Sequence, residues 1–158
     1  MSATQQTLSK EKSLSSATQS SAISAADTEK QRAADQNFLA ALKATDFGPI
    51  AFKLINPEEG DGWTLARATQ AVEQYRRFLF LVYRYPDQQI VPSREVDEVW
   101  HTHILDTAKY REDCDRLFGK FMDHWPYFGL RDEAQRAELN SAFSQTQQLF
   151  EKHFGPQS

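Results

Sequence analysis

The spacing of apolar residues along the chain predicts an all-α protein. Apolar positions recur every three or four residues in four segments, at 27–45, 64–85, 94–118 and 132–153, which is the period of an amphipathic helix. No segment shows the strict alternation that a half-buried strand requires. We therefore predict a compact helical bundle of about four main helices joined by short loops.

The breaks between these segments are marked by turn residues and aromatic residues. Glycines and prolines interrupt the pattern at 46–62, which predicts a turn, room for one short helix, and a surface loop. Ser93 is a suitable N-cap for the third segment, and Gly119 is a suitable residue to end it. The aromatic segment at 120–131 predicts a packed loop. We expect Trp63, Trp125 and Tyr127 in the core, with the stretch Trp125-Pro126-Tyr127-Phe128 as an alternative pocket lining.

Polar composition sets the N-terminal segment apart from the rest of the chain. Residues 1–30 contain eight serines, four threonines and no aromatic residue. Such a segment cannot bury enough apolar surface to offset the entropy lost on ordering, so we predict a disordered tail at 1–30 and a helical domain at 31–156. The segment lacks the charged start and apolar core of a secretory signal, and no apolar run is long enough for a membrane span, so no membrane association is expected.

Charge and cysteine content narrow the classes of partner. The formal net charge of -4 and the pI near 5.6 give no basic surface for nucleic acid, so none is expected as a partner. A single cysteine, Cys114, excludes an intramolecular disulfide and indicates a cytoplasmic location. We expect its thiol to be buried and structural.

Candidate chemistry is concentrated in residues 97–124, which hold three of the four histidines and the single cysteine. Imidazole and carboxylate groups together suit a divalent transition metal. On a regular helix His101 and His103 point about 200° apart, so both cannot bind one ion and we expect them to have different roles. Asp97 lies four residues before His101 and shares its face.

Chain reach predicts where the other candidate ligands lie. If 94–118 is one helix, His101 is about 25 Å from its end, whereas the residues from 118 to 124 span at most about 20 Å. His124 is therefore expected near Asp113 and Cys114, as a second possible metal cluster. If the last helix runs antiparallel to the third, His153 approaches Asp97 and His101 instead.

A longer motif in this region indicates a family. The stretch VDEVWHTHILDTAKYREDCDRLFG contains a W-H-x-H pair, then a tyrosine, then an Asp-Cys pair, at Trp100, His101, His103, Tyr110, Asp113 and Cys114. It resembles the glycine-rich domain-containing protein-like family, once described only as a domain of unknown function. The resemblance covers roughly residues 35 to 155 and implies no particular reaction or ligand.

Two functions of different classes follow from these residues. The first is a binding or interaction module for a protein or small molecule, in which Trp100, His103 and Tyr110 are mainly structural. The second is a metal-binding protein or metal-dependent enzyme that uses Asp97, His101 and a further histidine, with His103 or Tyr110 transferring a proton. The sequence identifies neither a substrate nor an oligomeric state.

Overall fold

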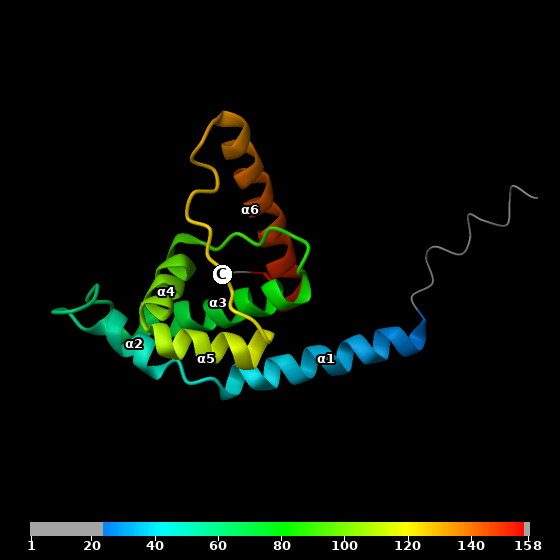
Figure 1. Ribbon diagram of the computed structural model, residues 1–158, viewed down its shortest axis with the longest axis horizontal. Coiled ribbons are helices and arrows are strands. Elements are labelled where there is room, and N and C mark those ends of the chain that lie inside the picture. The colour runs from blue at the N-terminus through cyan, green and yellow to red at the C-terminus, as the bar shows by residue number, and fades with distance from the viewer. Residues whose placement is uncertain (1–23, 157–158) are drawn as a thin grey trace, which may run out of the picture. The chain divides into compact units, whose positions relative to one another are not determined.

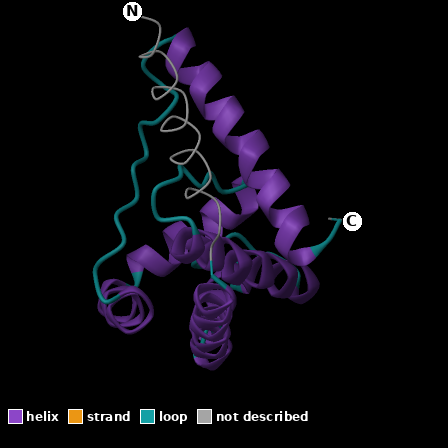
Figure 2. Cartoon of the chain, turned by 90° about the vertical axis from the view of Figure 1, so that its right-hand side faces the viewer, coloured by secondary structure: helices purple, strands orange, loops and turns teal. Residues whose placement is uncertain are grey.

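The computed structural model describes residues 24–156, which form helices joined by loops and contain no strand (Figures 1 and 2). In chain order the helices are α1 (Ala25–Ala44), α2 (Gly48–Ile55), α3 (Leu65–Arg84), α4 (Arg94–Leu105), α5 (Thr107–Phe118) and α6 (Glu133–Phe154). The prediction of an all-α fold is confirmed. The predicted number of about four main helices is wrong, because α2 is a separate helix and the helix expected at 94–118 is two.

The beginning of the described chain corrects the extent of the predicted tail. Residues 1–23 of the tail expected at 1–30 lie outside the described residues. Ser24 starts α1, because its Oγ accepts a hydrogen bond from the backbone N–H of Asp27 at 3.1 Å, as an N-cap side chain does. Residues 25–30 are therefore helical.

The described residues divide into two compact units, one ending at Gln36 and the other beginning at Asn37. The second unit holds the end of α1 and helices α2 to α6, and with them every candidate site residue. Its core is formed by large apolar and aromatic side chains, among them Phe47, Trp63 and Tyr75.

Helix α3 lies at the centre of this unit and contacts α2, α4 and α6. Four consecutive residues near its end are buried: Phe78, Leu79, Phe80 and Leu81. Since successive residues on a helix point about 100° apart, a run of this length means that more than one side of α3 is covered. Because α4 packs against this buried helix, its backbone and the motif residues on it are held in a fixed position.

The motif helix is broken at Asp106, whose backbone (φ -82°, ψ 73°) leaves the helical region. The predicted ends of the motif segment are confirmed: Ser93 caps α4 by accepting from the N–H of Val96 at 3.3 Å, and Gly119 ends α5 with a left-handed φ of 69°. Aspartate and threonine are both poor residues for a helix interior, so a break costs less here than at most positions. The break lets α5 turn back against α4, as their contacts show.

The connection from α5 to α6 is a long irregular loop that returns past α4 (Figure 1). Trp63 is buried, as expected, but the core placement expected for Trp125 and Tyr127 is wrong: they are 70% and 67% exposed. Gly129 allows the loop to pass close to α6. A Cβ at this residue, whose φ is +87°, would lie 2.4 Å from the side chain of Leu139. The loop therefore has a defined path although two of its aromatic rings face outward.

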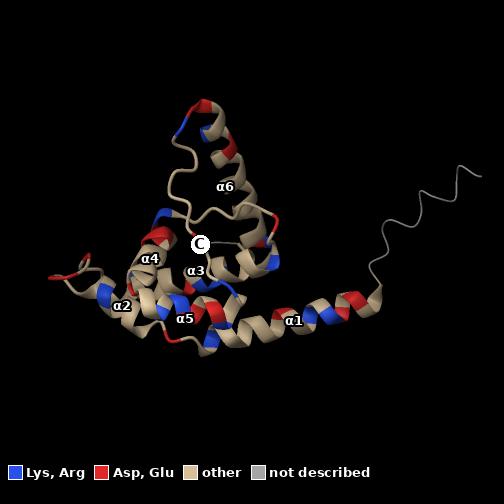
Figure 3. Ribbon diagram, in the orientation of Figure 1, with Lys and Arg blue, Asp and Glu red and all other residues tan. Residues whose placement is uncertain are grey.

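Charged residues are interspersed along the helices of the second unit (Figure 3). An ion pair joins α3 and α4, between Arg67 and Glu95, with 2.7 Å from Nε to Oε1. Both side chains are about half exposed, so the pair contributes about 1 kcal/mol or less. None of the helices among residues 24–156 is long and apolar enough to cross a membrane.

Candidate metal centre

The two histidines of the motif lie in opposite environments on α4. His103 is 2% exposed and sits in the core, with the ring of Phe47 edge-on at 5.2 Å. The His101 side chain is 52% exposed. His101 and His103 therefore point to different sides of α4, as helix geometry predicted, and they have different surroundings.

His103 is held by a chain of buried hydrogen bonds. The Tyr75 hydroxyl on α3 lies 2.8 Å from His103 Nδ1, and His103 Nε2 lies 2.8 Å from Asp113 Oδ2 on α5. A neutral imidazole has one donor and one acceptor, so the network fits the tautomer in which Tyr75 donates to Nδ1 and Nε2–H donates to Asp113. Burial lowers the pKa of His103 and raises the pKa of Tyr75 well above its ordinary value. Both groups are therefore in the protonation states that this network needs.

The buried Asp113 carboxylate is neutralised from its own helix. Lys109 Nζ lies 3.1 Å from Asp113 Oδ2, and the Arg116 guanidinium bonds to Oδ1. A buried carboxylate without such partners would be strongly destabilising. Asp113 therefore has the partners that it needs to serve as the anchor of His103.

A second buried contact fixes the loop that follows α5. The Trp100 indole Nε1–H donates to the Tyr110 hydroxyl at 2.9 Å, and that hydroxyl donates to the backbone carbonyl of Met122 at 2.6 Å. Burial raises the pKa of Tyr110, so its hydroxyl keeps the proton that it donates. Cys114, also buried as expected, has its thiol pKa raised by the same cause. These residues hold the loop two positions before His124.

His124 lies beside Asp97 and His101, which corrects the placement expected from chain reach. Its Nε2 is 2.7 Å from Asp97 Oδ1 and 3.1 Å from His101 Nε2, and His101 Nε2 is 3.5 Å from Asp97 Oδ2. The reach argument assumed one straight helix from 94 to 118. Because the chain turns at Asp106, the end of α5 is closer to the start of α4 than that assumption allowed.

The three groups form a compact candidate ligand set. One ligand atom from each of Asp97, His101 and His124 lies within 4.8 Å of the others, the only such set found among the described residues. The His124 ring also packs on Trp100, with ring centroids 4.2 Å apart. The exposed fractions of the Asp97 and His124 side chains are 33% and 14%, so the set is open to solvent mainly at His101.

When Asp97 is ionised, no placement of protons pairs a donor with an acceptor across all three of these contacts. If both histidines donate to Asp97, two donors face each other across the 3.1 Å contact between the Nε2 atoms. If one histidine instead accepts from the other, its lone pair faces the Asp97 carboxylate. A cation between the three groups would satisfy all of them at once, with both imidazoles neutral.

The other predicted ligand groupings are not assembled. His153 lies against α3, where its Nε2 is 2.6 Å from the Tyr85 hydroxyl and its ring packs on Phe80. The cluster expected from Asp113, Cys114 and His124 is divided, because Asp113 binds His103 and His124 binds Asp97. Of the residues proposed as ligands, the structure therefore brings Asp97, His101 and His124 together.

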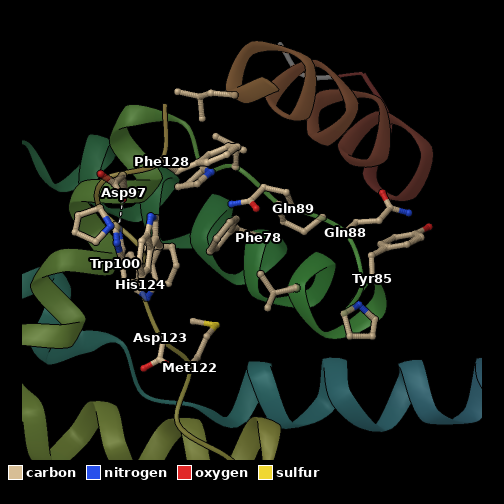
Figure 4. Close-up of a pocket in the computed structure, with 18 of the residues that line it drawn as sticks. Phe78, Tyr85, Gln88, Gln89, Asp97, Trp100, Met122, Asp123, His124 and Phe128 are labelled. Atoms are coloured by element: carbon tan, nitrogen blue, oxygen red, sulfur yellow. Dashed lines mark hydrogen bonds and ion pairs between the residues drawn. The ribbon is translucent and has the colours of Figure 1, made fainter. Parts of the chain in front are cut away.

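A cleft adjoins the ligand set. Asp97, Trp100 and His124 lie at one end of this cavity, and Tyr85 and Gln88 at the other (Figure 4). Its volume is about 500 Å³, within the range of small-molecule sites.

Sequence reasoning missed two residues that organise this region. Tyr75 on α3 and the backbone of Met122 complete the networks of His103 and Tyr110. Tyr75 falls in the inward stripe of its helix, so its burial could be read from the pattern. The hydrogen bond from Tyr75 to His103 could not be predicted from the pattern, because it depends on how α3 and α4 cross.

Comparison with known proteins places the chain in a family. A family model described as UCP032817-like matches residues 39–148, well over half of the chain. Glycine-rich domain-containing proteins 1 and 2 of Arabidopsis thaliana are 32% and 31% identical to it over 90 residues. These alignments cover 54% of this chain and 11% of each plant protein. No solved structure gives a significant match.

The chain therefore belongs to the UCP032817-like family, and its resemblance to the glycine-rich domain-containing proteins is confirmed. The matched residues include Asp97, His101 and His124, whereas His153 lies beyond them. The chain corresponds to only about a ninth of the length of the plant relatives it matches.

Proposed function

We propose that this member of the UCP032817-like family binds one divalent transition-metal ion through Asp97, His101 and His124. The observation that carries the proposal is the convergence of these three groups, in which any placement of protons leaves one close contact without a donor–acceptor pair. The remaining motif residues support the site from the core. A single cysteine, which forms no disulfide, suits a reducing, cytoplasmic setting for this role.

The distances between the ligand atoms favour an ion of the first transition series. Two imidazole nitrogens on a tetrahedral ion, each about 2.0 to 2.1 Å from the metal, are about 3.3 Å apart. The Nε2 atoms of His101 and His124 are 3.1 Å apart and His124 Nε2 is 2.7 Å from Asp97 Oδ1, so the ligand atoms would move apart by up to about 0.6 Å to take the ion. Two imidazoles and one carboxylate suit zinc, iron(II), cobalt and nickel.

The openness of the site favours a reactive or ligand-binding metal over a purely structural one. Structural zinc sites surround the ion with four protein ligands, whereas three protein ligands leave a position for water or a substrate. Here three ligands come from the protein, and the His101 side is half exposed. A metal-dependent reaction is therefore the natural extension of this proposal.

Metal analysis of protein prepared without a histidine tag tests the proposal. We expect about one zinc or cobalt ion per chain after equilibration and dialysis. His124→Ala should weaken the affinity by at least about a hundredfold, since it removes a direct ligand and not merely an outer partner. His153→Gln is the matched control and should bind as the wild type does. Absence of stoichiometric metal, with no heat of cobalt binding in calorimetry, would overturn the proposal.

A protein-contact role is a second candidate, favoured by the exposed loop before α6. Trp125, Tyr127 and Leu130 are each about two-thirds exposed or more. Aromatic residues grouped in this way are enriched at protein interfaces. Sedimentation at increasing concentration tests this surface for self-association, which Trp125→Ser should remove if a second copy is the partner. A monomer at all concentrations would exclude that partner.

A further inference from the structure

The cleft beside the ligand set is lined mainly by apolar and aromatic side chains. They come from the end of α3, the following loop, α4, the loop before α6, and α6 itself. The apolar lining includes Phe78, Val82, Ile90, Trp100, Phe128 and Leu139. Such a surface favours the hydrocarbon part of a ligand, because contact with it removes apolar area from water.

The cleft and the ligand set share two residues. Asp97 and His124 belong to the metal set and also line the cavity, and Figure 4 shows them at one end of it beside Trp100. A molecule lying in the cleft would therefore have one end next to the ion. His101 does not line the cleft, so that end would reach the ion from the side of Asp97 and His124, at a position that three protein ligands leave open.

The charge of the metal site determines which chemical group of the ligand would bind next to the ion. A divalent ion bound by one carboxylate and two neutral imidazoles carries a net charge of about +1, so it attracts an anion. Arg94 lines the same cavity and adds a positive charge near Asp97. Its side chain is 94% exposed and its Nε lies 3.7 Å from Glu98, so a loose surface pair leaves it free to turn toward a ligand.

A second acidic residue limits the charge of the ligand. Asp123 also lines the cleft, so an additional anionic group on the ligand would be repelled. The polar side chains along the remaining wall, Gln88 and Gln89, are uncharged. The lining therefore favours one anionic head on an otherwise apolar molecule.

From these features we propose that the cleft binds a small monocarboxylate with an apolar tail, its carboxylate completing the coordination of the metal and its tail lying against Phe78, Trp100 and Phe128. This inference rests on the proposed metal site and names the class of molecule that the site takes. The cavity of about 500 Å³ is large enough for a molecule of this size.

The test uses the full chain loaded with cobalt(II), whose visible spectrum reports changes in coordination. Octanoate, acetate and 1-octanol are titrated separately. We expect octanoate to change the cobalt spectrum and to bind at least about fiftyfold more tightly than acetate, because its tail gains buried area in the cleft. Octanol should bind at least about tenfold more weakly than octanoate, since it lacks the anionic group.

A pair of matched variants locates the tail. Phe128→Ala removes a ring from the cleft wall and should weaken octanoate binding about tenfold relative to acetate binding measured on the same cobalt-loaded variant. Phe52→Ala makes the same change at an exposed ring of α2 that does not line the cleft, and should have no effect.

The outcomes separate this inference from the proposal on which it rests. Failure of cobalt to bind would overturn the metal site itself. Normal cobalt binding with equal affinity for octanoate and acetate would overturn the cleft assignment alone. Octanoate binding that is equally tight without cobalt would also overturn it, because the carboxylate would not then be on the metal.

Discussion

At the scale of single residues, the motif separates into buried supports and exposed ligands. His103 accepts a hydrogen bond at Nδ1 and donates one from Nε2–H, so it has no lone pair left for a metal. His101, two positions away, has its Nε2 directed at Asp97 and His124. The period of the helix decides this difference, which is why it could be predicted from spacing alone.

The buried hydroxyl of Tyr75 gives a direct test of the support network. Tyr75→Phe removes the donor to His103 Nδ1 and leaves a buried acceptor unsatisfied. We expect a loss of about 1 to 3 kcal/mol in the free energy of unfolding, measured by urea denaturation. Tyr127→Phe, at an exposed ring, is the control and should change stability by less than about 0.5 kcal/mol. Equal stability of the two variants would contradict the network.

The thiol of Cys114 should be unreactive in the folded protein. It is buried, and burial raises its pKa, so the reactive thiolate is scarce near neutral pH. We predict that a disulfide reagent labels the native protein at least about a hundredfold more slowly than the protein in denaturant. Rapid labelling of the folded chain would show instead that the thiol is accessible.

At the scale of elements, the break at Asp106 determines which residues meet. A straight helix would have kept His124 away from His101, whereas the α4–α5 turn brings it to the start of α4. The dipeptide Asp106-Thr107 is a weak local signal for such a break, because both residues occur inside helices. The existence of the helical segments was therefore predictable, but the ligand set was not.

The loop that carries His124 is predicted to depend on Tyr110. Tyr110→Phe removes the donor to the Met122 carbonyl and the acceptor for Trp100, so the loop loses its buried anchor. We expect cobalt affinity to fall about tenfold, as for other outer-sphere supports, even where the variant remains folded by circular dichroism. Tyr127→Phe again serves as control. An unchanged affinity in folded Tyr110→Phe would mean that the loop is held by other contacts.

At the scale of the whole molecule, the partly exposed ligand set lies beside a buried hydrogen-bond network. Tyr75 on α3, His103 on α4 and Asp113 on α5 join three helices beneath the site. The all-α class follows from apolar periodicity, whereas the exposure of Trp125 and Tyr127 in the loop before α6 does not. The position of His153 did not follow. Its expected position required the last helix to pack against the helix predicted at 94–118, whereas α6 contacts α3.

Metal binding should stabilise the whole fold by mass action. An ion that binds the native state stabilises it by about 2.7 kcal/mol when its free concentration is a hundred times the dissociation constant. We therefore predict that zinc raises the melting temperature of the wild type by several degrees and that of His124→Ala by much less. An equal rise in both would indicate binding elsewhere on the chain.

The most direct measurement of the central claim is the position of a bound ion in crystals of the full chain grown with zinc. Anomalous diffraction at the zinc edge should show one strong peak within about 2.0 to 2.2 Å of Asp97, His101 and His124. A peak at other residues, or no peak at saturating zinc, would contradict the claim that these three side chains form a metal site.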